Sequence, residues 1–177
     1  DVLRGFNVTP TYTATSAPFL TANATTVGNG KLRIESVAVT TTNIAEGQNN
    51  VLLGKFKFVA EGEPVNITRM GLNFVFTTST ATTYVTDVTN VSLKDAAGTS
   101  VISGVDPASD ACSAAAKCGT ATSTDTVSVP VGETIYSVYG NLSTDWTAND
   151  TIQVGIFPAI ITAKGDVSGN TITPTPS

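Results

Sequence analysis

Apolar and polar residues alternate with a period of two along most of the chain, which is the pattern of a β-strand with one buried face. In the clearest case Leu52, Phe56 and Phe58 fall on one face. Lys55 and Lys57 fall on the other. No window places apolar residues at helical spacing without β-branched runs or glycine. The chain is therefore predicted to be all-β.

Further strands are expected between clusters of turn-forming residues. Their ranges are 32–39, 88–94, 99–103, 126–131, 134–142, 151–157 and 159–163. About eight short strands separated by turns favour a two-sheet antiparallel β-sandwich, Ig-like or jelly-roll-like, over a closed barrel. Strand spacing alone does not decide between the two.

One strand is expected to contain an irregularity. After the turn at residues 61–64, the apolar positions are odd at Val65 and Ile67 but even from Met70 onward. One extra residue near Thr68-Arg69, a β-bulge, would return both sets to the same face. A second turn, at residues 95–98, is expected to close a hairpin.

The length of 177 residues fits one main domain. We assign residues 30–172 to the sandwich, residues 1–29 to an N-terminal extension and residues 173–177 to a C-terminal tail. Uncharged hydroxyls supply most of the polarity, because the chain has 31 Thr and 14 Ser but only 13% charged residues. This composition is typical of a β-rich surface protein.

Charge and missing residue types argue against several functions. The net charge is −5 and no segment gathers Lys and Arg, which argues against nucleic-acid binding. The chain has no His, the usual general base and the commonest transition-metal ligand, so we expect neither an enzyme nor a cofactor. No apolar stretch approaches the ~20 residues of a membrane-spanning helix. The chain opens on Asp1 without a leader pattern, so we expect a mature product or an excised fragment of an extracellular or cell-surface protein.

Both cysteines lie in residues 105–125, which are rich in small and polar residues and are expected to form a long surface loop. In an oxidising compartment Cys112 and Cys118 would close a small disulfide ring worth about 2–2.5 kcal/mol in the chain-entropy model. A zinc site is disfavoured because no further Cys and no His could complete it. A free thiol pair is the remaining alternative.

The N-terminal extension has the alternating pattern of a β-strand. Its even positions include Val2, Phe6, Val8 and Tyr12, and Pro10 would have to lie at an edge or an interruption. Two interpretations stay open. The segment pairs within its own domain, or it adds to the open sheet of a neighbouring copy, where these four residues would form the subunit interface.

Candidate binding residues are few. Asp145 with Asp150, or Asp106 with Asp110, could share a calcium ion, although acids in turns without an ion are the commoner case. A glycosidase pair among the 14 acids is a remoter alternative.

Aromatic residues could form a platform for a sugar ring. Tyr136, Tyr139 and Trp146 are the candidates, but two tyrosines three residues apart on a strand point to opposite faces. Core or interface packing is the favoured interpretation.

Six asparagines begin the N-glycosylation pattern Asn-x-Ser/Thr: Asn7, Asn23, Asn66, Asn90, Asn141 and Asn149. Chance in so Thr-rich a chain would give about three, so the excess is mild. Alternation predicts that Asn66 and Asn90 face solvent.

Several segments, in this order, resemble the Ig-like β-sandwich modules of bacterial surface proteins, including those of candidate-phylum lineages. They are residues 51–58, 64–68, 88–93, 131–133, 149–154 and 161–165. The resemblance implies a structural or adhesive module at the cell surface and brings no catalytic residues. Residues 1–29 and the cysteine loop have no counterpart in it.

The leading hypothesis is a structural subunit of an extracellular filament that polymerises by adding its N-terminal strand to a neighbouring copy, with assembly resembling donor-strand fibres. Its partners would be copies of itself. The alternative is an adhesin or carbohydrate-binding module that recognises surface glycans.

Overall fold

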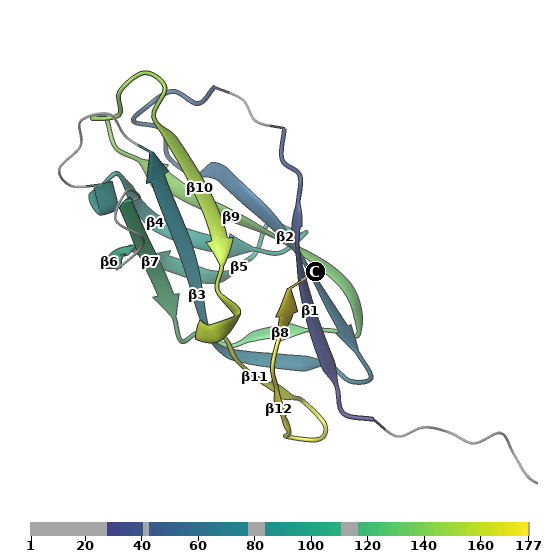
Figure 1. Ribbon diagram of the computed structural model, residues 1–177. Helices are drawn as coiled ribbons and strands as arrows, with labels where there is room; N and C mark the ends of the chain where they lie inside the picture. The colour runs from purple at the N-terminus through teal and green to yellow at the C-terminus, as the bar shows by residue number, and fades with distance from the viewer. Residues whose placement is uncertain (1–27, 41–42, 78–83, 111–116, 177) are drawn as a thin grey trace, which may run out of the picture.

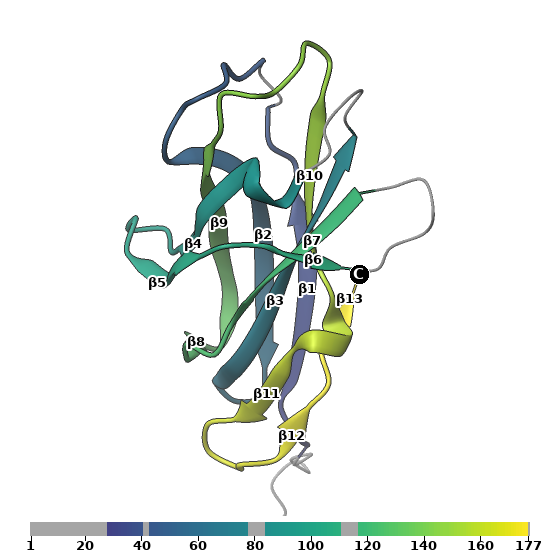
Figure 2. The ribbon, with the colours of Figure 1, turned by 90° about the vertical axis from the view of Figure 1, so that its left-hand side faces the viewer.

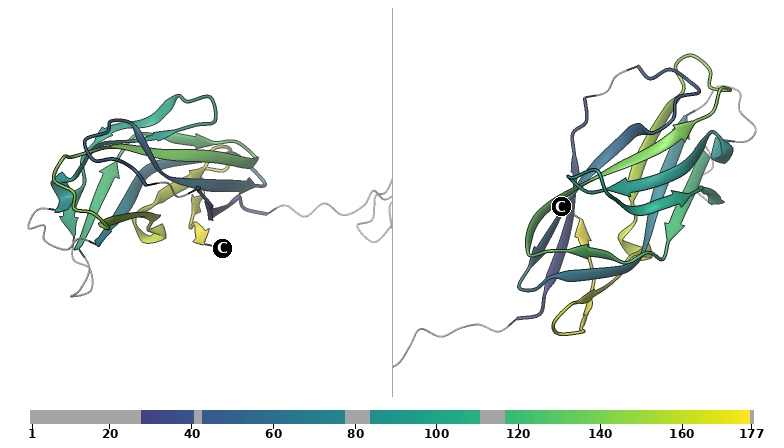
Figure 3. Two further views of the ribbon diagram at one scale, coloured as in Figure 1. Left: turned by 90° about the horizontal axis from the view of Figure 1, so that it is seen from above. Right: turned by 180° about the vertical axis from the view of Figure 1, so that it is seen from behind.

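The computed structural model describes residues 28–40, 43–77, 84–110 and 117–176. In this part of the chain two β-sheets pack face to face, and no α-helix is present (Figure 1). The all-β sandwich predicted from the sequence is therefore confirmed. Seen from above, the two sheets form separate layers (Figure 3).

The first sheet has six strands in the order β13-β1-β2-β9-β4-β5. Their bounds are β1 Lys31–Val37, β2 Val51–Glu61, β4 Val88–Lys94, β5 Ser100–Val105, β9 Gly132–Leu142 and β13 Thr175–Pro176. Neighbouring strands are antiparallel except β13, which runs parallel to β1. The predicted C-terminal tail at 173–177 thus contains a short strand at the sheet edge.

The second sheet is built around the long strand β3, Val65–Thr77. Its other members are β6 Ala108–Asp110, β7 Lys117–Ser123, β8 Val127–Val129, β10 Thr151–Ile156, β11 Thr162–Gly165 and β12 Thr171–Ile172. One side of β3 pairs with β7 and then β8, and the other pairs with β10 and then β11. Two short 3-10 turns, η2 (Tyr84–Thr86) and η3 (Pro158–Ile160), complete the described structure.

The core lies between the sheets and is supplied by alternate residues of each strand. Phe58 and Tyr136 meet edge to face with ring centroids 5.1 Å apart, and Phe74 and Phe76 stack at 6.3 Å. All four side chains are buried. Lys57 on the opposite face of β2 pairs with carboxylates on neighbouring strands, as the alternation in the sequence predicts.

The predicted bulge is present in β3. Thr162 of β11 lies opposite Arg69 and the next residue, Ala163, lies opposite Ile67, so Thr68 is the extra residue. The insertion shifts the inward face from Ile67 to Met70, both of which are buried. The predicted hairpin at residues 95–98 is also confirmed, with Gly98 N–H donating to the Asp95 carbonyl at 3.0 Å.

Residues 105–125 are not one long loop, so that prediction is wrong. The described part of the segment contains β6, which pairs with β7, and β7, which also pairs with β3. The inward residues of β7 include Gly119 and Ala121, which are small. A Cβ at Gly119 would lie 2.9 Å from Val85 Cγ1, so the small side chains that hide the strand pattern also let η2 pack closely.

The strand predicted at residues 159–163 is shifted toward the C-terminus. Pro158 opens the turn η3, and β11 begins only at Thr162. Figure 2 shows β10, this turn and β11 following one another along one edge of the second sheet. The apolar residues 156–161 therefore form the end of β10 and the turn η3. Within this turn, the Ile160 side chain packs over Gly71.

A buried carboxylate joins the start of β1 to the loop between β11 and β12. Glu63 Oε1 accepts hydrogen bonds from Gly30 N–H at 3.3 Å and from Ser168 Oγ at 2.6 Å. Its Oε2 accepts from the N–H groups of Val167 at 3.0 Å and Ser168 at 2.8 Å. These donors, led by Ser168, lower the pKa of Glu63.

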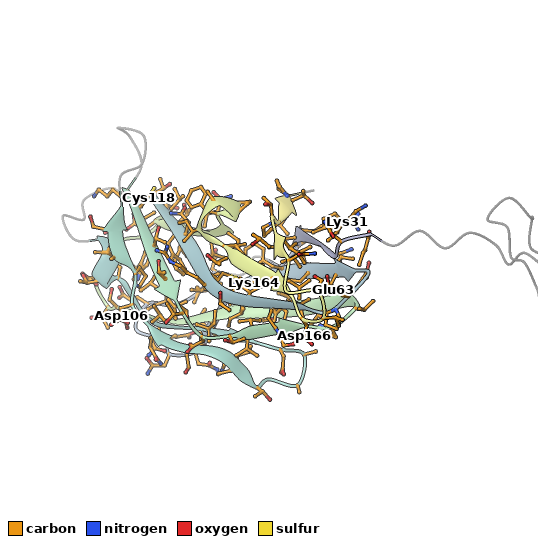
Figure 4. All side chains as sticks on the ribbon, turned by 90° about the horizontal axis from the view of Figure 1, so that it is seen from below. Lys31, Glu63, Asp106, Cys118, Lys164 and Asp166 are labelled. Atoms are coloured by element: carbon orange, nitrogen blue, oxygen red, sulfur yellow. The ribbon has the colours of Figure 1, made fainter. Side chains whose placement is uncertain are left out.

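Glycine makes room for this carboxylate, since a Cβ at Gly165 would lie within 3.0 Å of it. Figure 4 shows Glu63 at the same end of the sandwich as Lys31 and Asp166, with Cys118 at the opposite end. None of the helical turns in the described ranges is long or apolar enough to cross a membrane.

Candidate functional site: a groove at the loop end

A groove of about 840 Å³ opens at the end of the sandwich where β1 leads into β2 and β9 leads into β10 (Figure 1). We call it the loop-end groove. Its apolar lining includes Leu52, Leu53, Leu142 and Ile152, which extend the core to the surface. Its polar lining includes Asn43, Glu46, Asn149 and Asp150. None of the described residues that line it is Lys or Arg.

Backbone hydrogen bonds hold the two loops of the groove together. Gly47 N–H donates to the Ser143 carbonyl at 2.7 Å, and Leu142 N–H donates to the Gln48 carbonyl at 2.8 Å. Gly47 has φ 70°, a left-handed conformation that glycine adopts without strain. These hydrogen bonds fix the two loops relative to each other and so support the shape of the groove.

Trp146 lies in the wall of the groove and is anchored from behind. Its indole Nε1–H donates to the Asp87 carbonyl at 3.3 Å, and its ring centroid lies 6.2 Å from that of Phe76. The side chain is half-buried and packs against the core. Core packing, the favoured interpretation of the sequence, holds for Trp146, which also presents part of its surface to the groove.

The three aromatic residues do not form a platform, in agreement with the favoured interpretation of the sequence. Tyr136 is buried and its hydroxyl donates to the Ser128 carbonyl at 3.1 Å. Tyr139 is on the other face of β9, with Lys94 Nζ 4.6 Å from its ring centroid. Only Trp146 of the three reaches the groove, because residues three apart on a strand face opposite ways.

Asp87 supports the groove from below and was missed in the sequence. It is only 3% exposed, and Oδ1 has no hydrogen-bond partner among the described residues. Burial is the main cause that raises the pKa of Asp87, with the negative charges of Asp145 and Asp150 adding to it. No periodic pattern marks Asp87, since it lies between a 3-10 turn and β4.

The acids considered for calcium are engaged locally. Asp145 accepts a hydrogen bond from the Ser143 hydroxyl, and Asp150 Oδ2 accepts one from Thr147 N–H at 3.0 Å. Asp106 Oδ1 accepts from Asn90 N–H at 2.7 Å, whereas the side chain of Asp110 lies outside the described residues. Among the described residues, no three His, Cys, Asp or Glu side chains lie close enough to hold a metal ion.

The described sequons fall into two classes. Asn90 and Asn149 are exposed and have positive φ values of 51° and 76°. Asn66 is half-buried and donates to Asp166 at 2.5 Å, so its predicted exposure is only partial. Asn141 is half-buried and accepts from the backbone of Asn50 at 2.9 Å. Of the four described sequons, Asn90 and Asn149 are therefore the most accessible.

Several predicted site residues lie outside the described residues. They are Val2, Phe6, Asn7, Val8, Tyr12, Asn23 and Cys112. Cys118 is buried in β7 opposite Val75. The Cys112–Cys118 disulfide stays a prediction, which peptide mapping of the non-reduced protein would test.

A smaller groove, of about 180 Å³, lies on the flank of the sandwich between β1 and β10. Ile34 and Ser36 line it from β1, and Ile156 lines it from β10. Phe56 of β2 and three prolines, Pro158, Pro174 and Pro176, complete its mostly apolar lining. We call this region the β1–β10 flank.

Comparison with known proteins adds little to this geometry. No protein-family model matches the chain, and no curated protein matches it. Among solved structures, the chain is similar to a CBM3a-L domain with flanking linkers from scaffoldin cipA of the cellulosome of Clostridium thermocellum, with 14% identity and a TM-score of 0.36 over 86% of this chain and 94% of that chain. A similarity at this level carries no inference about function, which rests on the groove itself.

Proposed function

We propose that the protein is an extracellular, non-catalytic binding module that takes a carbohydrate in the loop-end groove. The observation that carries the proposal is that the Trp146 side chain lines one groove together with amide, carboxylate and hydroxyl groups. Sugars offer apolar ring faces and many hydroxyls, so a partly exposed indole beside hydrogen-bonding side chains suits them.

The charge of the lining favours a neutral ligand. Glu46 and Asp150 are acidic, and the described lining has no cation to balance a phosphate or sulfate group. Asn43 and Asn149 each carry both a donor and an acceptor, which suits sugar hydroxyls. A neutral polyhydroxylated chain fits this surface better than an anionic one.

Glycan-array screening of the full chain, followed by titration of the ligands found, tests the proposal. Trp146 is the single tryptophan, so its fluorescence should change on binding. Trp146→Ala and the exposed Glu46→Ala should each weaken binding by roughly tenfold or more, the effect of losing about 1.4 kcal/mol. Tyr139→Ala, on the far face of β9, is the control and should bind as the unmodified chain does.

Two results would overturn the proposal. One is that no glycan on the array is retained or changes the Trp146 emission. The other is that Glu46→Ala and Trp146→Ala both bind the ligand with unchanged affinity. The exposed Glu46 side chain contributes little to folding, so its loss tests binding alone.

A second candidate function is the structural subunit of a surface filament, as the alternation in residues 1–29 predicts. The observation that favours it is the outer edge of β10, which pairs with β3 on one side and has no described partner on the other. Electron microscopy of the purified full chain tests this function, because fibres would be directly visible.

A further inference from the structure

We infer that the outer edge of β10 pairs with the same edge of a second copy of this chain, so that two sandwiches share one continuous sheet. The inference goes beyond carbohydrate binding and does not depend on it. The contact is isologous, so it closes on two copies, and a filament would need a further contact at another surface.

β10 is a regular strand with one open edge. All six of its residues, Thr151–Ile156, pair with β3 in an unbroken antiparallel register. Figure 1 shows β3 beside β10, and on its other side β10 has no partner among the described residues. An edge of this kind offers backbone N–H and C=O groups to another strand.

The strands at the other sheet edges have features that limit such pairing. β6, β12 and β13 have only two or three residues each. β5 has six residues, but its ladder with β4 shifts register twice and Gly104 has φ 67°. Short strands and irregular ladders are among the means by which natural sheets avoid edge-to-edge association. Among these edge strands of the described structure, β10 combines length with a regular ladder.

β10 also lacks the charge that often protects an edge strand. No residue from Thr151 to Phe157 is charged, and proline follows only at Pro158. A charged partner strand would find no counter-charge along this edge, whereas a second β10 would place no like charges opposite each other. The absence of charge therefore favours a second copy as the partner.

The inward side chains of β10 are incompletely covered. Val154 lies against Gly54 of β2, so Ile152 and Ile156 share its inward face. All three β10 side chains are half-buried, although the β3 residues opposite them are buried. Ile156 also lines the smaller groove of the β1–β10 flank, and Phe157, which follows it, is 46% exposed. A second strand beside β10 would cover these apolar side chains from their open side.

Antiparallel pairing about a twofold axis keeps like faces together. With the axis at Val154, this residue lies opposite its own counterpart, and Ile152 lies opposite Ile156 of the second copy. On the outward face Gln153 then lies opposite Gly155 of the second copy, where no side chain competes for space. The sequence of β10 is therefore complementary to itself.

Charges placed on the outward face of β10 test the inference in the full chain. Gln153 is exposed, and a Cβ at Gly155 would meet no atom within 4 Å. Gln153→Lys with Gly155→Lys, and Gln153→Glu with Gly155→Glu, each place like charges opposite each other between the two copies. Gln153→Thr with Gly155→Thr is the neutral control at the same positions. Circular dichroism checks that each variant keeps its β-sheet.

Sedimentation velocity should show a reversible monomer–dimer equilibrium for the unmodified chain and for the threonine control. The lysine and glutamate variants should each dimerise roughly tenfold more weakly at low salt. An equimolar mixture of these two variants should dimerise at least as tightly as the unmodified chain, because opposite charges then face each other.

Hydrogen exchange of the unmodified chain gives a test that needs no variant. As the protein concentration is raised through the dimerisation range, amide exchange in β10 should slow, because its outward N–H groups become hydrogen-bonded. Exchange in β5, at an edge of the other sheet, should not change and serves as the internal control.

The inference fails if the unmodified chain is monomeric at every concentration measured. It also fails if the chain associates while β10 exchanges as fast as in the monomer, or if the charged variants associate as tightly as the unmodified chain. If the charged variants are monomeric and their mixture does not recover association, antiparallel pairing of β10 with itself is excluded.

Discussion

Replacing Gly54 by alanine should force the two sheets apart where Gly54 of β2 faces Val154 of β10. The added methyl would lie within 3.0 Å of Val154 Cγ1, whereas carbon atoms normally stay about 3.5–4.0 Å apart. Overpacking of this kind costs about 1–3 kcal/mol, and the loss of glycine's extra backbone freedom returns about 0.5–1 kcal/mol. We therefore expect Gly54→Ala to lower the free energy of unfolding by about 1–2 kcal/mol.

A double-mutant cycle isolates this contact. Val154 is half-buried, so Val154→Ala alone should cost about 1 kcal/mol. In Val154→Ala the clashing methyl groups are gone, so adding Gly54→Ala should stabilise the chain by about 0.5–1 kcal/mol. The coupling free energy is then the overpacking cost itself, about 1–3 kcal/mol. Urea unfolding followed by Trp146 fluorescence and circular dichroism measures all four proteins.

Gly155→Ala is the matched control for this cycle. It makes the same substitution one residue from Val154, but at Gly155 a Cβ would meet no atom within 4 Å. It should change the free energy of unfolding by no more than about 0.5 kcal/mol. If the effects of Gly54→Ala and Val154→Ala add within about 0.5 kcal/mol, the close contact of the sheets is not as described.

Three further predictions follow from buried polar groups. Tyr136→Phe removes the hydrogen bond to the Ser128 carbonyl and should cost about 1 kcal/mol in urea unfolding. The folded chain lowers the pKa of Glu63 from its ordinary value of 4.5, so this carboxylate stabilises the fold above that pH and the stabilisation is lost as pH falls. Glu63→Gln should therefore lower the melting temperature at neutral pH and make it decline less steeply in acid. The pKa of Asp87 is raised in the folded chain, so the effect of pH on stability is the reverse, and stability falls as pH rises through the titration of Asp87. Asp87→Asn should therefore raise the melting temperature at neutral pH and remove this fall.

The strand pattern could be predicted wherever large apolar residues alternate with polar ones. β2 and the Thr68 bulge were both readable because Phe56, Phe58 and Met70 mark the inward face unambiguously. β7 was missed because Gly119 and Ala121 carry its inward face without a hydrophobic signal. Small residues in a strand are invisible to alternation but are what close packing against η2 requires.

The candidate site could be predicted only in part. Trp146 was singled out from its residue type, but Glu46 and Asp87 were not. Glu46 lines the groove with Trp146, and the Asp87 carbonyl accepts from the Trp146 indole, only when segments distant in sequence come together. Hydrogen bonds such as Gly47 N–H to the Ser143 carbonyl join segments almost a hundred residues apart. No local periodicity in the sequence predicts that these segments lie side by side, because their contact depends on the strand order of the sheets.

The Glu63 carboxylate also determines how the domain would respond to tension. It fixes Gly30, the residue before β1, to the hairpin loop at Ser168. A pull on the chain at Gly30 along the axis of β1 would load this attachment together with all seven residue pairs between β1 and β2, from Lys31 to Val37. Strands sheared lengthwise must break such a ladder in one step, whereas strands peeled from one end break it pair by pair. The start of β1 is thus held by contacts that resist a pull along the strand.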